Sequence, residues 1–203
     1  MKNPAIAHAL SRFFAIGILV VAATALIAGC ATPTKGSRPQ APLGAVSHVD
    51  LKRYMGDWRV ISEIPYFAEK DCVGSIESYR LLGDGTIDNW FTYREKTFKA
   101  PLKKITAHAF VINQQTNAEW SVHFFGGLIQ AKYLVIDLDP DYRWTVVGHP
   151  SRNYGWIMAR EKILPKATYE AILKRLIAKG YDISRFKMTP QFPSQLAPPT
   201  ERE

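Results

Sequence analysis

The stretch SIESYRLLGDGTIDNWFTYR, residues 75–94, decides the fold of this chain. Two runs that favour strands, residues 75–82 and 86–94, flank the triplet Gly83-Asp84-Gly85. Glycine adopts positive φ without steric cost, so the triplet predicts the tight turn of a β-hairpin. A hairpin of this kind makes antiparallel neighbours the expected arrangement for the strands on either side.

Six further strand-length runs extend this pattern along the chain. They cover residues 57–64, 103–113, 118–125, 131–138, 143–148 and 154–160, and turn-forming residues separate them. Eight antiparallel strands with short connections can close into a barrel that holds one small ligand. Beyond them, Tyr169, Ile172, Leu173, Leu176 and Ile177 recur at helical spacing. We therefore expect an all-β fold, an eight-stranded antiparallel up-and-down barrel with one C-terminal α-helix packed outside, and a last short strand at Phe186 and Met188.

Residues 1–29 have the pattern of a secretory signal. Lys2 and Arg12 precede sixteen uncharged residues, 13–28, fewer than the roughly 20 that span a bilayer as a helix. The run ends in Leu26-Ile27-Ala28-Gly29-Cys30, which is similar to the lipobox of bacterial lipoproteins. The similarity implies cleavage after Gly29 and lipidation of Cys30. Ala31 then favours the outer membrane of a Gram-negative host, facing the periplasm; a plain membrane anchor or an unprocessed signal is the alternative.

The mature chain has room for one domain. Removal of 29 of the 203 residues leaves 174, with a formal charge of +6 in place of +8. Residues 30–47 are predicted to be the lipidated cysteine and a flexible tether, 48–189 the folded domain, and 190–203 a disordered tail with four prolines. The basic residues are scattered rather than clustered, which argues against a nucleic-acid partner.

Three motifs, in order, carry a family resemblance. Tyr54-Met55-Gly56-Asp57-Trp58 opens the first strand, Leu138-Asp139-Pro140-Asp141-Tyr142 follows the sixth, and residues 154–160, YGWIMAR, form the eighth. Together they resemble the signature regions of the lipocalins, closest to the bacterial outer-membrane lipoprotein lipocalins and to apolipoprotein D, over about residues 49–187. The resemblance implies that Arg160 lies over the indole of Trp58 and donates to backbone carbonyls of the entering segment. The structural signature residues are Gly56, Trp58, Asp139 and Arg160.

Every second side chain of each strand should point into the barrel, because successive side chains along a strand point to opposite faces. Alternation puts Ile105 and Ala107 on one face of their strand, and the register implied by the resemblance supplies most other positions. The predicted ligand-binding residues are Tyr79, Asn89, Phe91, Ile105, Ala107, Val122, Phe124, Tyr133, Val135, Thr145, Val147, Tyr154 and Trp156. This lining is apolar, aromatic and nearly uncharged, which suits an acyl chain.

The resemblance implies a membrane-anchored lipid-binding protein that stores or transports fatty acids or lysophospholipids for cell-envelope maintenance, with a homodimer left open. Two alternatives remain: a lipocalin-fold enzyme on a hydrophobic substrate, and a ligandless structural lipoprotein. An enzyme would need an acid–base group in the cavity, where Glu77 and Asp137 are the inward candidates, although Glu77 is expected mainly as a solvated carboxylate at the rim.

We expect no catalytic residue, no cofactor and no metal site in this chain. His108 and His123 are expected opposite each other on the outer face, but a metal site needs more ligands than two. Cys72 resembles a cysteine that apolipoprotein D uses in a disulfide. Its counterpart is absent, because Cys30 should carry lipid, so Cys72 is expected as a loop thiol without a role.

Overall fold

The computed structural model describes residues 41–66 and 69–196. The predicted signal peptide, Cys30 and most of the predicted tether lie outside the described residues. Among those described, no helix is long and apolar enough to cross a membrane.

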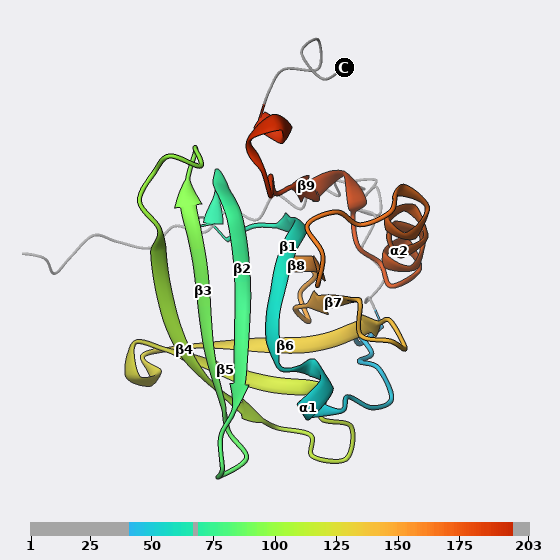
Figure 1. Cartoon of the computed structure of the whole chain (residues 1–203). Helices are drawn as coiled ribbons and strands as arrows, with labels where there is room; N and C mark the ends of the chain where they lie inside the picture. Colours follow the sequence, from blue (N-terminus) through green and yellow to red (C-terminus); the bar gives the residue numbers. More distant parts are fainter. Residues whose placement is uncertain (1–40, 67–68, 197–203) are drawn as a thin grey trace, which may run out of the picture. The chain divides into compact units, whose positions relative to one another are not determined.

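The core of the domain is a closed antiparallel barrel, as the strand pattern predicts (Figure 1). Each strand pairs with the next along the chain, and β1 closes the barrel by pairing with β2 through Gly56–Arg59 and with β8 through Arg59–Ile64. The eight strands are β1 (Gly56–Ile64), β2 (Cys72–Leu81), β3 (Ile87–Glu95), β4 (Lys103–Val111), β5 (Glu119–Phe124), β6 (Ile129–Leu138), β7 (Trp144–Gly148) and β8 (Gly155–Ala159).

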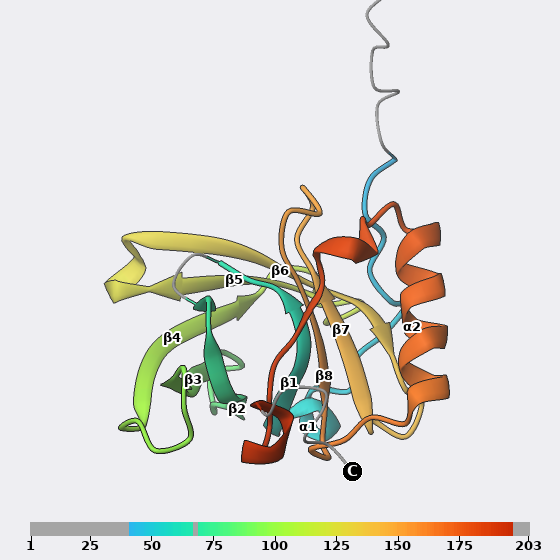
Figure 2. The same cartoon turned by 90° about the horizontal axis from the view of Figure 1, so that it is seen from above.

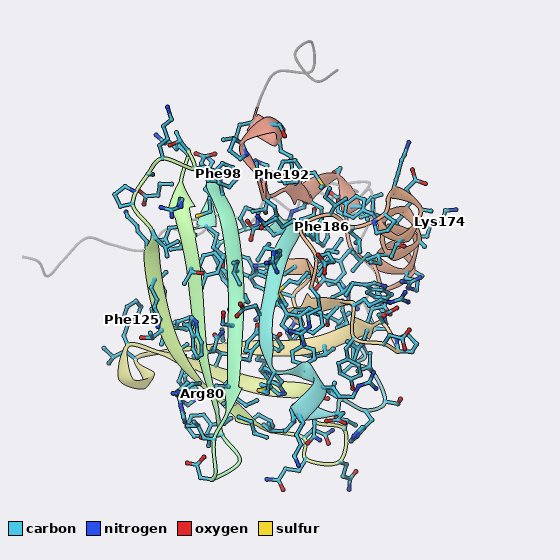
Figure 3. All side chains as sticks on the ribbon, in the orientation of Figure 1. Arg80, Phe98, Phe125, Lys174, Phe186 and Phe192 are labelled. Carbon is cyan, nitrogen blue, oxygen red and sulfur yellow. The ribbon has the colours of Figure 1, made fainter. Side chains whose placement is uncertain are left out.

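The predicted helix is α2 (Lys166–Ala178), and it packs outside the barrel beside β7 (Figure 2). Its buried face presents Ile172 and Leu176, which join a second hydrophobic cluster with outward residues of the barrel wall such as Val146. The predicted last strand is also present: β9 (Lys187–Met188) pairs with β1 at Ser62 and Glu63. The sequence pattern did not predict the short helix α1 (Leu51–Tyr54), which Asp50 caps by accepting from two backbone N–H groups. The described residues also include the 3-10 turns η2 (Phe125–Gly127), η3 (Ile183–Arg185) and η4 (Pro193–Leu196). The side chain of Phe125 in η2 is exposed at the edge of the barrel (Figure 3).

One end of the barrel is filled by aromatic side chains. Trp58 is fully buried there, and its indole donates to the carbonyl of Tyr54 at 2.8 Å. The Arg160 guanidinium lies 3.7 Å from the centre of the Trp58 ring and donates to four carbonyls of the entering segment, those of Arg53, Tyr54, Met55 and Asp57. Gly56 has a φ of +89°, a backbone conformation that residues with a Cβ rarely adopt, so the motif favours glycine at this position. Cation–π contact and several charge-assisted bonds together tie the entering segment to the last strand.

The second signature motif supports the same end. Asp139 is buried and accepts from both the backbone N–H and the guanidinium of Arg143, which lowers the pKa of this carboxyl. The Tyr142 hydroxyl accepts from the backbone N–H of Asp50, and Arg53 lies over its ring. Asp139 therefore holds the turn between β6 and β7, and that turn contacts α1.

Three bulges interrupt the described ladders, and each reverses which face a side chain points to. They lie between Val60 and Ser62 in β1, between Val73 and Ile76 in β2, and between Val135 and Asp137 in β6. After the first bulge Ser62 points outward and accepts from the Tyr169 hydroxyl of α2, while its neighbour Glu63 points inward beside Trp156.

Two predicted boundaries are wrong. Residues 41–47 are not a free tether, because Leu43 is buried and the Val46 N–H donates to the Val135 carbonyl at 2.8 Å. Residues 190–196 are not a disordered tail, because Gln191 is buried and donates to the Val60 carbonyl at 2.7 Å and the Ser75 carbonyl at 3.1 Å. Both carbonyls lie at bulges, where the ladder is interrupted, so Gln191 supplies hydrogen bonds that the strands do not.

Candidate functional site

A small cavity lies inside the barrel above the aromatic base. Its volume is about 80 Å³, and residues of six strands and of the β1–β2 connection line it. The hydroxyl groups of Tyr54, Tyr133 and Tyr79 form a hydrogen-bonded chain at its floor, with oxygen separations of 2.8 and 3.0 Å. The lining residues are Tyr66, Glu69, Glu77, Tyr79, Asn89, Val122, Phe124, Ala131, Lys132, Tyr133, Val147, Trp156 and Met158.

About half of the predicted ligand-binding residues line this cavity. They are Tyr79, Asn89, Val122, Phe124, Tyr133, Val147 and Trp156, and their part in binding stays a prediction. Phe91 and Val135 are buried in the surrounding core, and Thr145 is buried with its hydroxyl 3.3 Å from that of Tyr54. Ile105 and Ala107 pack against the same core, opposite Phe91 and Asn89, and also border an open groove along β4 that touches His108 and His123. Tyr154 stacks on Tyr66, with ring centres 3.8 Å apart.

Several lining residues escaped the sequence pattern. Tyr66 and Glu69 lie in the connection between β1 and β2, where no alternation exists to place a side chain. Met158 lies two residues after Trp156 and faces inward opposite Val60, so alternation along β8 would have identified it. Alternation along residues 131–138 could not assign Ala131 and Lys132 to the inner or the outer face of the barrel, because both faces of that run are largely apolar.

Three carboxyl groups gather in and beside the cavity: Glu63, Glu69 and Glu77, which we call the acidic cluster. Glu69 and Glu77 line the cavity, and Glu63 is 4% exposed. Burial raises the pKa of Glu77 to about 8, although the Asn89 amide, which donates to it at 2.7 Å, opposes the rise. Burial also raises the pKa of Glu63, and the charge of Glu69 raises it further. The pKa of Glu69 is raised mainly by burial as well. Glu77 pairs with Trp58 in the ladder, lines the cavity and accepts from Asn89, so the expectation of a solvated carboxylate at the rim is wrong.

Asp137, the other predicted inward carboxylate, points away from the cavity. The bulge between Val135 and Asp137 turns it outward, where it forms an ion pair with Arg175 of α2. The inward acidic groups are thus Glu63, Glu69 and Glu77, of which alternation identifies Glu77 alone.

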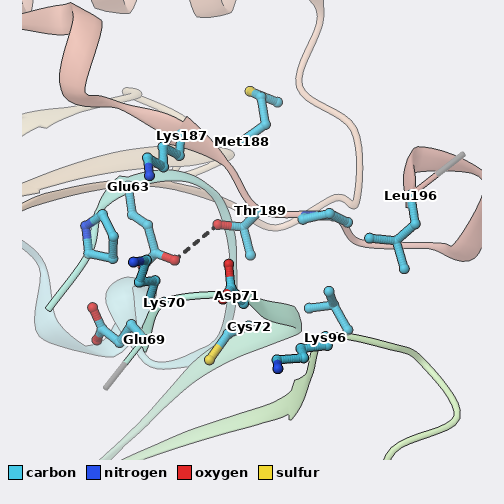
Figure 4. Close-up of a pocket in the computed structure, with 13 residues that line it drawn as sticks. Glu63, Glu69, Lys70, Asp71, Cys72, Lys96, Lys187, Met188, Thr189 and Leu196 are labelled. Carbon is cyan, nitrogen blue, oxygen red and sulfur yellow. Dashed lines mark hydrogen bonds between the residues drawn. The ribbon is translucent and has the colours of Figure 1, made fainter. Parts of the chain in front are cut away.

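A groove of about 360 Å³ adjoins the acidic cluster on the side of β9 (Figure 4). Glu63 and Glu69 line it, and Thr189 donates to Glu63 Oε1 at 3.2 Å. Cys72 also lines this groove; it is the buried first residue of β2 rather than a loop thiol, and burial raises its pKa to about 12. Within the described parts of the chain, no group of three or more His, Cys, Asp or Glu is arranged to hold a metal ion.

Comparison with known proteins agrees with this architecture. The family model of the lipocalin-like domain matches residues 49–191. Temperature-induced lipocalin-1 of Arabidopsis thaliana is 30% identical over 72% of this chain and 81% of its own length. Outer membrane lipoprotein Blc of Escherichia coli is 30% identical over 83% of this chain and 93% of its own, and mouse apolipoprotein D is 26% identical over 82% and 92%.

Among solved structures, insecticyanin of the tobacco hornworm Manduca sexta superposes with a TM-score of 0.60 at 16% identity, over 76% of this chain and 86% of that one. At this identity the likeness concerns the fold. The closed barrel, the external helix and the match over residues 49–191 lead to one conclusion: this chain belongs to the lipocalin-like domain family.

Proposed function

We propose that this protein is a membrane-anchored lipid carrier that binds fatty acids, lysophospholipids or similar amphiphiles and stores or transports them for maintenance of the cell envelope. The observation that carries the proposal is the cavity in the barrel, with a wall of Phe124, Val122, Val147 and Trp156. Apolar and aromatic walls with a few polar groups are the usual surroundings of a small hydrophobic ligand. Proteins of this family generally bind ligands and do not catalyse reactions.

The location is part of the same proposal. Lipid attached to Cys30 would hold the barrel at the periplasmic face of the outer membrane, as the name of the Escherichia coli relative, an outer membrane lipoprotein, suggests for this chain. Several acyl chains on one cysteine give stable anchoring, because a single chain binds a bilayer reversibly.

The size of the cavity favours a second candidate, a structural lipoprotein with a filled barrel. Pockets for drug-sized ligands measure about 300–1,000 Å³, and this cavity measures about 80 Å³. An acyl chain of twelve carbons would therefore enter only if the wall opened. The stacked pair Tyr66 and Tyr154 lies beside the cavity and is one contact that such an opening would break.

Native mass spectrometry of the full chain, purified from its own host in a detergent without an acyl chain, distinguishes the two candidates. Carriage predicts that a lipid co-purifies with the protein and that delipidated protein takes up added lysophospholipid. A filled barrel predicts the bare mass in both experiments. Uptake followed by release of a chemically altered lipid would instead support the enzyme alternative.

A further inference from the structure

Three large apolar side chains lie close together and exposed at the turn between β5 and β6. Phe125 is 66% exposed, Leu128 87% and Ile129 55%. Figure 2 shows this hairpin reaching beyond the neighbouring strands, and Figure 3 shows Phe125 at the outer edge of the barrel. Apolar surface gathered in this way is unfavourable in water and marks a place where another surface covers the protein.

This turn lies at the end of the barrel opposite the aromatic base. β1 begins next to Trp58 at the base, and every strand runs antiparallel to the next. The β1–β2, β3–β4, β5–β6 and β7–β8 connections therefore all lie at the other end, which we call the open end. Leu102, at the close of the β3–β4 connection, is 59% exposed, so two of these connections carry exposed apolar side chains.

The two ends of the barrel also differ in charge among the described residues. The open-end connections hold four basic and two acidic residues, a formal charge of +2, whereas those at the base hold one basic and three acidic residues, a formal charge of −2. The first set is Lys70, Lys96, Lys99 and Arg152 with Glu69 and Asp71, and the second is Arg143 with Asp84, Asp139 and Asp141. Lys96 and Lys99 are exposed in the same connection as Leu102, and lysines at a membrane surface are attracted to anionic lipids.

The N-terminal segment is fastened at the open end as well. Arg152, in the β7–β8 connection, is 9% exposed, and its guanidinium donates to the carbonyls of Ala41 and Lys179, both at 2.7 Å. Ten residues separate Ala41 from Cys30, and a chain of this length reaches at most about 38 Å when fully extended. Lipid on Cys30 would therefore hold the barrel by its open end rather than by its base.

We propose that the open end of the barrel docks on an anionic phospholipid bilayer, with Phe125, Leu128 and Leu102 entering the interface and Lys96 and Lys99 meeting the head groups. The inference rests on the proposed lipid anchor and goes beyond it, because an anchor alone does not fix which face of the barrel meets the membrane. Apolar side chains at the acyl boundary, with lysines at the head groups, are a combination by which proteins bind membrane surfaces. The mouth of the barrel then faces the lipid from which a carrier would take its ligand.

The test reads the depth of single labels in the full chain, held in nanodiscs of phosphatidylcholine and phosphatidylglycerol with and without a nitroxide lipid. Leu102→Cys carries an environment-sensitive fluorophore at the open end, and Ile112→Cys carries it at the base, where Ile112 is 64% exposed. Cys72 is buried with its pKa raised to about 12, so it should not take the label; the wild type carried through the same labelling is the blank. We expect the label at residue 102 to shift to the blue and to be quenched severalfold more strongly than the label at residue 112.

A second pair of variants tests the hairpin itself. Phe125→Ser combined with Leu128→Ser should reduce the quenching at residue 102 to the level at residue 112, whereas Ile163→Ser, a change at an equally exposed apolar residue outside the open end, should leave it unchanged. All three side chains are exposed, so the substitutions should not disturb folding.

The outcomes separate this inference from the anchor on which it rests. Failure of the protein to stay with the nanodiscs would overturn the anchor, and the inference with it. Retention with equal quenching at both labels, or stronger quenching at residue 112, would overturn docking by the open end and leave the anchor standing. A blue shift at residue 102 without quenching would mean that a second copy of the chain covers this surface, which also overturns the proposal, and quenching that the double serine variant does not reduce would overturn the part given to Phe125 and Leu128.

Discussion

Replacing Glu77 with glutamine should change how the stability of this barrel depends on pH. Glu77 lines the cavity, and burial raises its pKa from 4.5 to about 8. The glutamine has nearly the same shape, and its amide oxygen can still accept from Asn89, so the substitution removes the titration while it keeps the hydrogen bond.

The sign and size of the expected change in the free energy of unfolding with pH follow from proton linkage. Between pH 4.5 and 8 the folded protein holds a proton on Glu77 that the unfolded chain has released, so the free energy of unfolding falls as pH rises through this window. One group contributes a slope of about 1.4 kcal/mol per pH unit, and the full interval corresponds to about 5 kcal/mol, an upper figure because local rearrangement or entry of water would lessen it. Below pH 4.5 the contribution is constant.

The measurement is urea unfolding of the wild type and of Glu77→Gln at pH 5, 6, 7 and 8, with Glu161→Gln as the exposed control. Groups that do not interact with Glu77 cancel in the difference between the curves. We expect the variant to gain stability relative to the wild type with each step in pH, and the control to run parallel to the wild type. Parallel curves for Glu77→Gln would show that Glu77 is ionised and solvated in the folded protein, which would refute the burial argument.

Three further predictions concern the rest of the chain. Arg160→Lys should lower the free energy of unfolding by about 2–4 kcal/mol, because lysine cannot reach four carbonyls at once; a melting temperature equal to that of the wild type would contradict this. Gln191→Ala should cost about 2 kcal/mol in chemical denaturation, since it leaves two bulge carbonyls unpaired, and an unchanged midpoint would mean that water replaces the amide. Cys30→Ser should abolish the incorporation of labelled fatty acid into the protein, and labelling equal to that of the wild type would argue against lipidation of Cys30.

The fold could be predicted from the sequence because its determinants are local. The Gly83-Asp84-Gly85 turn, the strand runs and the helical spacing around Ile172 act within a few residues of one another, and all of them agree with the closed barrel and α2. The boundaries could not be predicted in this way. Gln191 is held by carbonyls more than a hundred positions away in sequence, a contact that composition and proline content do not reveal.

The cavity was harder to predict, because alternation fails at each bulge. A bulge adds one residue to a strand and reverses the parity of everything beyond it. In β1 this moves Glu63 from the outer face to the inner one, and in β6 it moves Asp137 from the inner face to the ion pair with Arg175. Strict alternation therefore places Glu63 on the outer face of the barrel and Asp137 on the inner face, the reverse of what the structure has.

The same bulge in β1 connects the acidic cluster with the C-terminal segment. By turning Glu63 inward it adds a third carboxyl to Glu69 and Glu77, and by interrupting the ladder at Val60 it creates the carbonyl that Gln191 covers. Thr189, two residues before Gln191, donates to Glu63 itself. The segment that contains Thr189 and Gln191 thus pairs both groups that the inserted residue leaves exposed to desolvation, the inward Glu63 carboxyl and the Val60 carbonyl. If Gln191→Ala loosens this segment, the hydrogen bond from Thr189 to Glu63 weakens too, so one substitution disturbs both the bulge and the buried carboxyl.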